Sequence, residues 1–232
     1  MGKVAWVFKR KGLQRELQET RQHVADLERM QCGLSWKPND LRRHEARVFS
    51  QNGEDGIIQE IFRRVGTTNK QFVEFGVQHG GECNCRRLVV EEDWKGLFME
   101  MDDEDFKRLK QRYAGAEGVN CVQAQVTSAA IQDLLEKHQV PLCFDMLSID
   151  IDGNDYWVWR AIQKWRPRVV VIEFNSHYRP PIHWVMQEND DFRWHGTSYF
   201  GASLSSLNRL AGWKKYKLVG TDSRGINAFF VR

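Results

Sequence analysis

The stretch that decides the fold is "FVEFGVQHGGECN", residues 72–84. Phe72, Val73 and Phe75 predict a buried strand, and the glycines that begin at Gly76 predict that the strand ends there. A carboxylate, Glu74, stands inside the apolar run. Burying a carboxylate in a strand costs free energy unless a partner group binds it. The sequence therefore predicts a partner for Glu74 at the end of this strand.

Outward from this stretch, apolar segments that predict strands alternate with amphipathic segments that predict helices. Two further strands follow close together and are joined by the short turn "SRG", which predicts an antiparallel hairpin at one edge. The alternation predicts an α/β protein with a doubly wound, mostly parallel sheet. The expected strands lie at 70–77, 95–102, 118–126, 142–152, 166–175, 216–222 and 226–232.

The N-terminal region differs from the rest of the chain. Residues 1–30 carry the whole net charge of +3, and residues 11–31 predict a helix with heptad-like apolar positions. Such a helix would pack on its own domain, mediate self-association or bind a pathway partner, or approach an anionic membrane surface. We therefore divide the chain into a basic helical extension and linker at residues 1–47 and an α/β domain at residues 48–232.

Composition narrows the class of protein. The chain has 232 residues and 41% apolar residues, enough for a globular core. No apolar run reaches the roughly 20 residues of a transmembrane helix, and no basic stripe interleaved with aromatics predicts nucleic-acid binding. The five cysteines form no CxxC pair, which favours reduced thiols over a disulfide framework or a zinc ribbon. With no secretory signal evident, we expect a cytoplasmic protein.

The strand ends hold the candidate binding residues, because ligands of open parallel sheets bind at the carboxyl ends of the strands. The turn after the first strand contains Gly76 and Gly80 but no GxGxxG or GKS/T pattern, which disfavours a dinucleotide or P-loop site. Glu100, at the end of the second strand, is placed to accept hydrogen bonds from a ribose diol. Ala124 and Gln125, after the third strand, are placed to lie against a base.

The fourth and fifth predicted strands end in acidic residues. Asp150, Asp152 and Asp155 crowd one strand end, and Glu173 and Asn175 follow the next strand. Adjacent strand ends lie about 5 Å apart, so Asp150 or Asp152 could share a site with Glu173 and Asn175. Oxygen ligands of this kind suit Mg²⁺ or Mn²⁺. The alternative is that these groups bind cofactor, substrate and one another without a metal.

Together these residues resemble the class I methyltransferases that use S-adenosylmethionine, and within them the FkbM-like branch, whose members often methylate sugar hydroxyls. The resemblance covers about residues 48–232 and implies a seven-stranded Rossmann-like sheet. It is carried, in order, by "FSQNGEDGIIQEIF", "FVEFGVQHGGECN", "GLFMEMD", "LSIDIDGNDYWVW", "RVVVIEFN", "YFGASLSSL" and "GINAFFVR". Cys85 departs from the Thr that relatives tend to have.

The resemblance also implies roles for the strand-end residues. Glu74 would lie at the methionine end of the cofactor, near its ammonium group, and Gly76 and Gly80 would let the backbone pass the methionine and ribose. Glu100 would bind the ribose hydroxyls. The segment "SQNGED" would fold over the methionine end, with Gln51 and Glu54 as contacts.

Methyl transfer needs an acceptor oxygen aligned with the methyl group and a group that takes its proton. We expect Asp150 to face both cofactor and acceptor, Asp152 to act as the base or to orient the acceptor, and Glu173 and Asn175 to hold the acceptor diol or a metal. Other candidates are His177, His183 and His195 as bases, Trp184 and Trp194 as sugar-stacking rings, Trp157 and Trp159 as core residues, and Tyr199 and Ser203 as the pocket floor.

The sequence therefore predicts an O-methyltransferase that acts on a sugar hydroxyl of a surface glycan or of a glycosylated or nucleotide-linked metabolite. A methyltransferase with a phosphoryl-type or amine acceptor, and a non-catalytic cofactor-binding scaffold, are the alternatives. A nicotinamide enzyme is disfavoured by the missing GxGxxG pattern.

Overall fold

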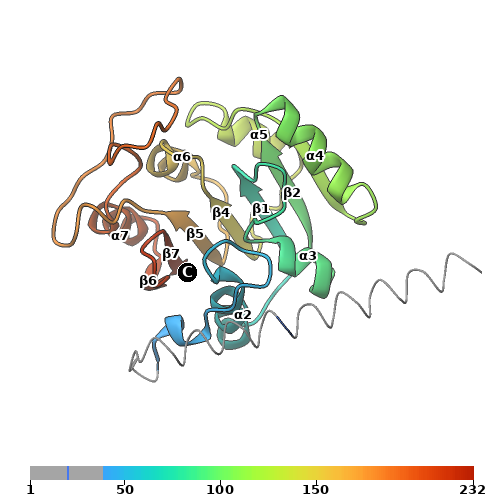
Figure 1. Cartoon of the computed structure of the whole chain (residues 1–232), viewed down its shortest axis with the longest axis horizontal. Helices are drawn as coiled ribbons and strands as arrows, with labels where there is room; N and C mark the ends of the chain where they lie inside the picture. Colours follow the sequence, from blue (N-terminus) through green and yellow to red (C-terminus); the bar gives the residue numbers. More distant parts are fainter. Residues whose placement is uncertain (1–19, 21–38) are drawn as a thin grey trace, which may run out of the picture.

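The computed structural model describes Thr20 and residues 39–232. The helix predicted at residues 11–31 lies outside the described residues, apart from Thr20. The described chain forms one seven-stranded sheet in the order β3-β2-β1-β4-β5-β7-β6 (Figure 1). Its strands are β1 (Gln71–Phe75), β2 (Lys95–Glu100), β3 (Val119–Gln123), β4 (Met146–Ile149), β5 (Val169–Glu173), β6 (Lys217–Thr221) and β7 (Asn227–Val231).

The sheet is doubly wound and mostly parallel, as predicted. Strands β1 to β5 pair in parallel, whereas β7 pairs antiparallel with both β5 and β6. The hairpin predicted from the "SRG" turn is therefore confirmed, with β7 inserted between β5 and the edge strand β6. The chain leaves β1 toward β2 and β3 on one side, and then crosses to β4 and β5 on the other. The switch in strand order thus falls between β1 and β4, where α/β sheets bind ligands.

Helices cover both faces of the sheet (Figure 1). Side chains from α2, α3 and α4 pack on one face and those from α5, α6 and α7 pack on the other. The bounds are α2 (Glu54–Val65), α3 (Arg86–Glu92), α4 (Asp103–Tyr113), α5 (Ile131–Lys137), α6 (Asp155–Ala161) and α7 (Leu204–Trp213), preceded by a short 3₁₀ helix, η1 (Leu41–His44). Among the described residues, no helix is long and apolar enough to span a membrane.

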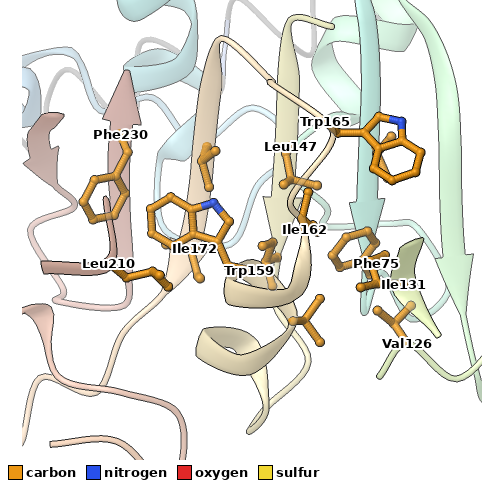
Figure 2. Close-up of a cluster of buried hydrophobic side chains, with 14 of the residues drawn as sticks. Phe75, Val126, Ile131, Leu147, Trp159, Ile162, Trp165, Ile172, Leu210 and Phe230 are labelled. Atoms are coloured by element: carbon orange, nitrogen blue, oxygen red, sulfur yellow. The ribbon is translucent and has the colours of Figure 1, made fainter. Parts of the chain in front are cut away.

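Alternate residues of β1 serve the two faces, as the period of a strand requires. Val73 and Phe75 belong to the core beneath α5–α7, and Phe72 belongs to the core beneath α2–α4. Figure 2 shows the first core, where the ring of Trp159 of α6 lies beside that of Phe230, with 5.0 Å between the ring centroids. Trp159 is 1% exposed, which confirms its prediction as a core residue.

The described part of the predicted extension packs on the domain. Leu41 and Ala46 are buried, and the carboxylate of Glu45 accepts hydrogen bonds from Ser223 in the β6–β7 turn. Leu41 contributes to the same core as α2, so this part of the extension packs with the domain, and the domain boundary at residue 48 stays a prediction.

Candidate active site

The carboxyl ends of β1 and β4 approach each other closely at Gly76. A Cβ atom at this position would lie 1.6 Å from the backbone oxygen of Asp150, and Gly76 has a φ of +72°. Only glycine fits this combination of space and conformation without displacement of the backbone. Gly76 thus places the turn after β1 directly against Asp150 at the switch in strand order.

Glu74 caps the turn that follows its own strand. Its carboxylate accepts hydrogen bonds from the backbone N–H groups of Asn84 and Cys85, at 2.7 and 2.8 Å, and the side chain is 3% exposed. Burial raises the pKa of Glu74, and these two hydrogen bonds oppose the shift. Glu74 therefore fixes the start of α3 and also lines a cavity, and its predicted contact with a cofactor ammonium stays a prediction.

Glu100, the last residue of β2, holds the next turn. Its carboxylate accepts hydrogen bonds from the N–H groups of Gln78, Met101 and Asp102, at 2.6, 2.8 and 2.9 Å. These bonds join the turn after β1 to the turn after β2. Each carboxylate oxygen can accept more than one hydrogen bond, so Glu100 keeps acceptor capacity toward the cavity that it lines.

Two cavities meet at the strand ends. The first, of about 250 Å³, lies over β1, β2 and β4 and is lined by Glu100, Ala124 and Gln125 among others. The second, of about 450 Å³, lies over β1, β4 and β5 beneath the segment that leads into α2. Both are lined by Gly76, Gln78, Asp150, Asp152 and Trp194. The two aspartates therefore stand at the junction of the cavities.

The segment "SQNGED" lies over the second cavity, and its predicted place at the methionine end of a cofactor stays a prediction. Asp55 accepts hydrogen bonds from the N–H groups of Val48, Phe49 and Ser50, which fold the segment back on the start of α2. Gln51 and Glu54 both line the cavity. Glu54 is 1% exposed and is held by Asn52 and by Asn227 of β7.

Three carboxylates converge where β4 and β5 end. One oxygen from each of Asp150, Asp152 and Glu173 lies within 4.8 Å of the others, and Glu173 Oε2 is buried with no hydrogen-bond partner. Burial raises the pKa of Asp150 and of Glu173 well above the usual range, and the neighbouring carboxylates raise it further. Buried carboxylates in this proximity are stabilised by a proton or by a cation.

Asp152 and Asp155 have different environments. Asp155 is fully buried and accepts hydrogen bonds from the N–H groups of Ile151 and Gly153, so it orders the loop after β4. Burial raises the pKa of Asp155 to about 6. Asp152 is exposed to the cavities and has a φ of +56°, an uncommon conformation for a non-glycine residue. Such strain is concentrated at functional sites.

Asn175 differs from its prediction as a partner of the acids. It is 0% exposed, its amide donates to the carbonyl oxygens of Ser198 and Phe200, and its side-chain oxygen accepts from the N–H of His177. Asn175 is therefore an anchor for the loop that follows β5, because backbone groups occupy its side chain.

Gly80 also differs from its prediction. A Cβ atom there would lie 2.5 Å from Leu109 and 2.8 Å from Tyr113, both on α4, and Gly80 lines neither cavity. Its φ of +66° and this close packing require glycine for the fit of the turn against α4. Sequence reasoning could not separate this requirement from a close approach to a ligand.

The loop between β5 and α7 lines both cavities and carries the two tryptophans that were predicted to stack on a sugar. Trp194 is 51% exposed and lines both cavities, whereas Trp184 stacks on Tyr178 with ring centroids 4.2 Å apart and lines neither. Trp157 is partly buried, and its indole N–H donates to the carbonyl oxygen of Met186. Trp194 is thus the predicted stacking ring that the structure places at the site.

The other predicted residues of this loop lie elsewhere. Of the three candidate histidines, His177 lines the second cavity, and His183 and His195 line neither. Ser203 caps α7 and Tyr199 is 46% exposed, so neither forms the pocket floor, contrary to the prediction.

Several lining residues were missed by sequence reasoning. Phe192 and Arg193 reach the first cavity from the loop after β5, and His79 and Glu82 line the second. Asn154 ties this loop to α6 through hydrogen bonds with Asn189. The segment "ENDDF" at residues 188–192 was the available signal, since polar residues in a long loop after a strand often serve a site.

Solved structures share this fold. No protein-family model and no curated protein match the chain. The O-methyltransferase TomG from Streptomyces achromogenes, involved in tomaymycin synthesis and solved with SAM, is 16% identical, with a TM-score of 0.50 over 92% of this chain and 96% of that one. A putative O-methyltransferase from Klebsiella pneumoniae is 15% identical over the same shares, with a TM-score of 0.47. The chain therefore has the Rossmann-like fold of class I methyltransferases, with the predicted antiparallel edge hairpin.

Proposed function

We propose that the protein is an S-adenosylmethionine-dependent O-methyltransferase of the FkbM-like kind, acting on a sugar hydroxyl. The observation that carries the proposal is the junction of two cavities at Asp150 and Asp152, at the switch point of the sheet. The first cavity offers a site for the adenosine portion of a cofactor, and the second offers room for its methionine end and for an acceptor. Transfer between two bound molecules requires such a meeting point.

The first cavity would hold the adenosine portion of S-adenosylmethionine, which supplies a methyl group on a sulfonium when bound. Glu100 would accept hydrogen bonds from the ribose hydroxyls, and Ala124 and Gln125 would lie beside the adenine. Gly76 lets the backbone approach the cofactor closely, and Glu74, in the adjoining cavity, would face its ammonium group. Gln51 lines the same adjoining cavity and would contact that end of the cofactor.

The residues at the junction would position and deprotonate the acceptor. Partial burial raises the pKa of Asp152, which is the direction of shift that favours a general base. Asp152 is exposed to both cavities, so it can reach an acceptor hydroxyl and take its proton. Asp150 and Glu173 would hold the acceptor from the side of the sheet.

The same three carboxylates suit a divalent cation. Carboxylate oxygens are the ligands that Mg²⁺ and Mn²⁺ prefer, and the unpartnered Glu173 Oε2 provides an unused ligand atom. A bound ion would lower the pKa of the acceptor hydroxyl. Loss of turnover in EDTA and its recovery with Mn²⁺ would support the ion, and full turnover in EDTA would leave Asp152 as the base without it.

The acceptor cavity favours a neutral polyol over an anion. Its lining includes six carboxylates, from Glu54, Glu74, Glu82, Asp150, Asp152 and Glu173, and no Lys or Arg among the described residues. A phosphate or carboxylate group would be repelled here, so the phosphates of a nucleotide-linked acceptor would have to lie outside this cavity. The exposed ring of Trp194 offers a surface on which a sugar can stack.

An amine acceptor is the second candidate, and the same six carboxylates favour it. A protonated amine would be attracted to the acidic lining and would have to lose a proton before methylation. A panel that pairs each sugar with its amino-sugar counterpart separates the two candidates. Methyl transfer to the hydroxyl sugars supports the first proposal, and transfer to the amino group alone supports the second.

Calorimetric titration with S-adenosylhomocysteine tests the cofactor assignment. We expect micromolar binding both with Mg²⁺ and with EDTA, because the proposed cofactor residues do not depend on the ion. Absence of binding in both conditions would contradict the methyltransferase proposal.

We further propose that the enzyme is cytoplasmic and that residues 11–31 mediate self-association or docking to a pathway partner. Four cysteines in the described residues are free thiols, which agrees with a reducing compartment. Deletion of residues 1–31 would lower the mass in solution if they form a dimer.

A further inference from the structure

A third cavity lies at the end of the sheet opposite the candidate active site. Its volume is about 360 Å³, and it is formed where the connection from α6 to β5 meets the connection from α7 to β6. Strands β5 and β6 begin here and β7 ends here. None of its lining residues lines either cavity of the candidate active site. It is therefore a separate site.

The lining of this third cavity is cationic. Arg166, Lys214, Lys215 and Arg232 all line it, and no Asp or Glu side chain does so among the described residues. The acceptor cavity shows the opposite composition, with carboxylates and no Lys or Arg. A cluster of like charges around one cavity is unfavourable unless an ion of opposite charge joins it.

The pKa of Lys214 reflects its burial and the repulsion between the cations of this cluster. Burial, and the nearby charge of Arg166, lower the pKa of Lys214 to about 8. Its Nζ donates one hydrogen bond, to the carbonyl oxygen of Ile162 at 2.6 Å, and an ammonium group has three donors. Arg166 likewise donates to the carbonyl oxygens of Gln163 and Trp165. Both groups therefore keep donors for an anion.

Aromatic rings complete the cavity. Trp159, Trp165 and Tyr216 are buried in its lining, and Trp213 is 68% exposed. The guanidinium of Arg209 lies 5.9 Å from the ring centroid of Trp213. An exposed tryptophan beside a cationic cluster suits a ligand that combines an anionic group with a flat or apolar portion.

We propose that this third cavity binds the phosphate monoester group of a small organic phosphate. A phosphate monoester carries a charge of about −1.5 to −2 near neutral pH, which balances several converging cations better than a single carboxylate does. Arg pairs with two phosphate oxygens at once, and Lys contributes a point charge. The organic portion would lie on Trp213.

Calorimetric titration tests the proposal on the full chain with saturating S-adenosylhomocysteine present, so that the cofactor cavity is blocked. The probes are inorganic phosphate, adenosine monophosphate and sodium chloride at matched ionic strength. We expect saturable binding of both phosphates, tighter for the nucleotide, and none for chloride. Vesicles of phosphatidylcholine with and without phosphatidic acid form a separate arm, and binding to the vesicles alone would overturn the small-molecule assignment.

Two variants and a matched control locate the site. Lys214→Met and Arg166→Met should each weaken phosphate binding by about ten-fold or more, because each removes a charged hydrogen bond. Lys217→Met removes a cation three residues further on, from an exposed position outside the cavity, and should leave binding unchanged. Equal loss in all three variants, or no saturable phosphate binding by the wild-type chain, would overturn the proposal. Neither outcome bears on the methyltransferase proposal, which the S-adenosylhomocysteine titration tests by itself.

Discussion

Replacing Gly76 with alanine tests whether the close approach of β1 and β4 builds the site. The added Cβ atom would lie 1.6 Å from the backbone oxygen of Asp150, a separation at which the two strand ends must move apart. The same substitution also forces an alanine into a positive φ of +72°. Both effects act where the two cavities meet, so the variant should damage stability and cofactor binding together.

Gly201→Ala separates these two effects. Gly201 also has a positive φ, of +59°, but a Cβ atom there would meet nothing within 4 Å. The control variant should therefore lose only the backbone term, about 1–2 kcal/mol of unfolding free energy. Gly76→Ala should lose that amount and a further 1–3 kcal/mol or so for the overlap, since packed structures resist added volume by about this much.

Urea unfolding followed by tryptophan fluorescence measures both losses, and titration with S-adenosylhomocysteine measures the effect on the site. We expect the midpoint of Gly76→Ala to fall well below that of Gly201→Ala, and cofactor affinity to fall in Gly76→Ala alone. If the two variants match in stability and both bind like the wild-type chain, the close approach at Gly76 does not shape the site. That result would refute the reasoning that places Gly76 at its centre.

Three further predictions concern the carboxylates. Glu100→Ala should weaken S-adenosylhomocysteine binding by about ten-fold or more. The control, Glu104→Ala, removes an exposed carboxylate from α4 and should leave the affinity unchanged. An unchanged dissociation constant in Glu100→Ala would place the cofactor elsewhere. Asp152→Asn should abolish turnover in a methyl-transfer assay while cofactor affinity is kept, and wild-type turnover would eliminate Asp152 as the base. Burial and neighbouring carboxylates raise the pKa of Glu173 in the folded state, so the folded chain binds this proton more tightly than the unfolded chain does. The free energy of unfolding should therefore fall as pH rises above about 4.3, the usual pKa of a glutamate side chain. Glu173→Gln should flatten that fall in urea unfolding with EDTA. A fall as steep as that of the wild-type chain would show that the proton on Glu173 does not stabilise the folded chain.

The sequence determined the sheet, its mostly parallel pairing and its antiparallel edge hairpin. Apolar runs such as Val169–Glu173 predict buried strands because both faces of a parallel sheet are covered by helices. The short turn before β7 predicted the edge hairpin, since a few residues can join only antiparallel neighbours. These features depend on local periodicity and on connection length, and both can be read along the chain.

The sequence also predicted which residues gather at the candidate site, because the carboxyl ends of parallel strands share one edge of the sheet. That rule brought Asp150 and Glu173 together correctly, since β4 and β5 are neighbours. It failed for Asn175, whose amide is taken by the loop after β5, and for Gly80, which packs on α4. Strand position fixes where a backbone ends but not which way a side chain turns after it.

Only the tertiary structure decided the composition of the cavities. Gln51 and Glu173 meet in one cavity across more than a hundred residues of sequence, and Arg166, Lys214 and Arg232 meet in another at the opposite end of the sheet. The net charge of +3 does not indicate that the folded chain has one acidic cavity and one cationic cavity. Charge sums along the chain ignore position, whereas the electrostatic field in a cavity depends on which side chains the folded sheet brings within a few ångströms of one another.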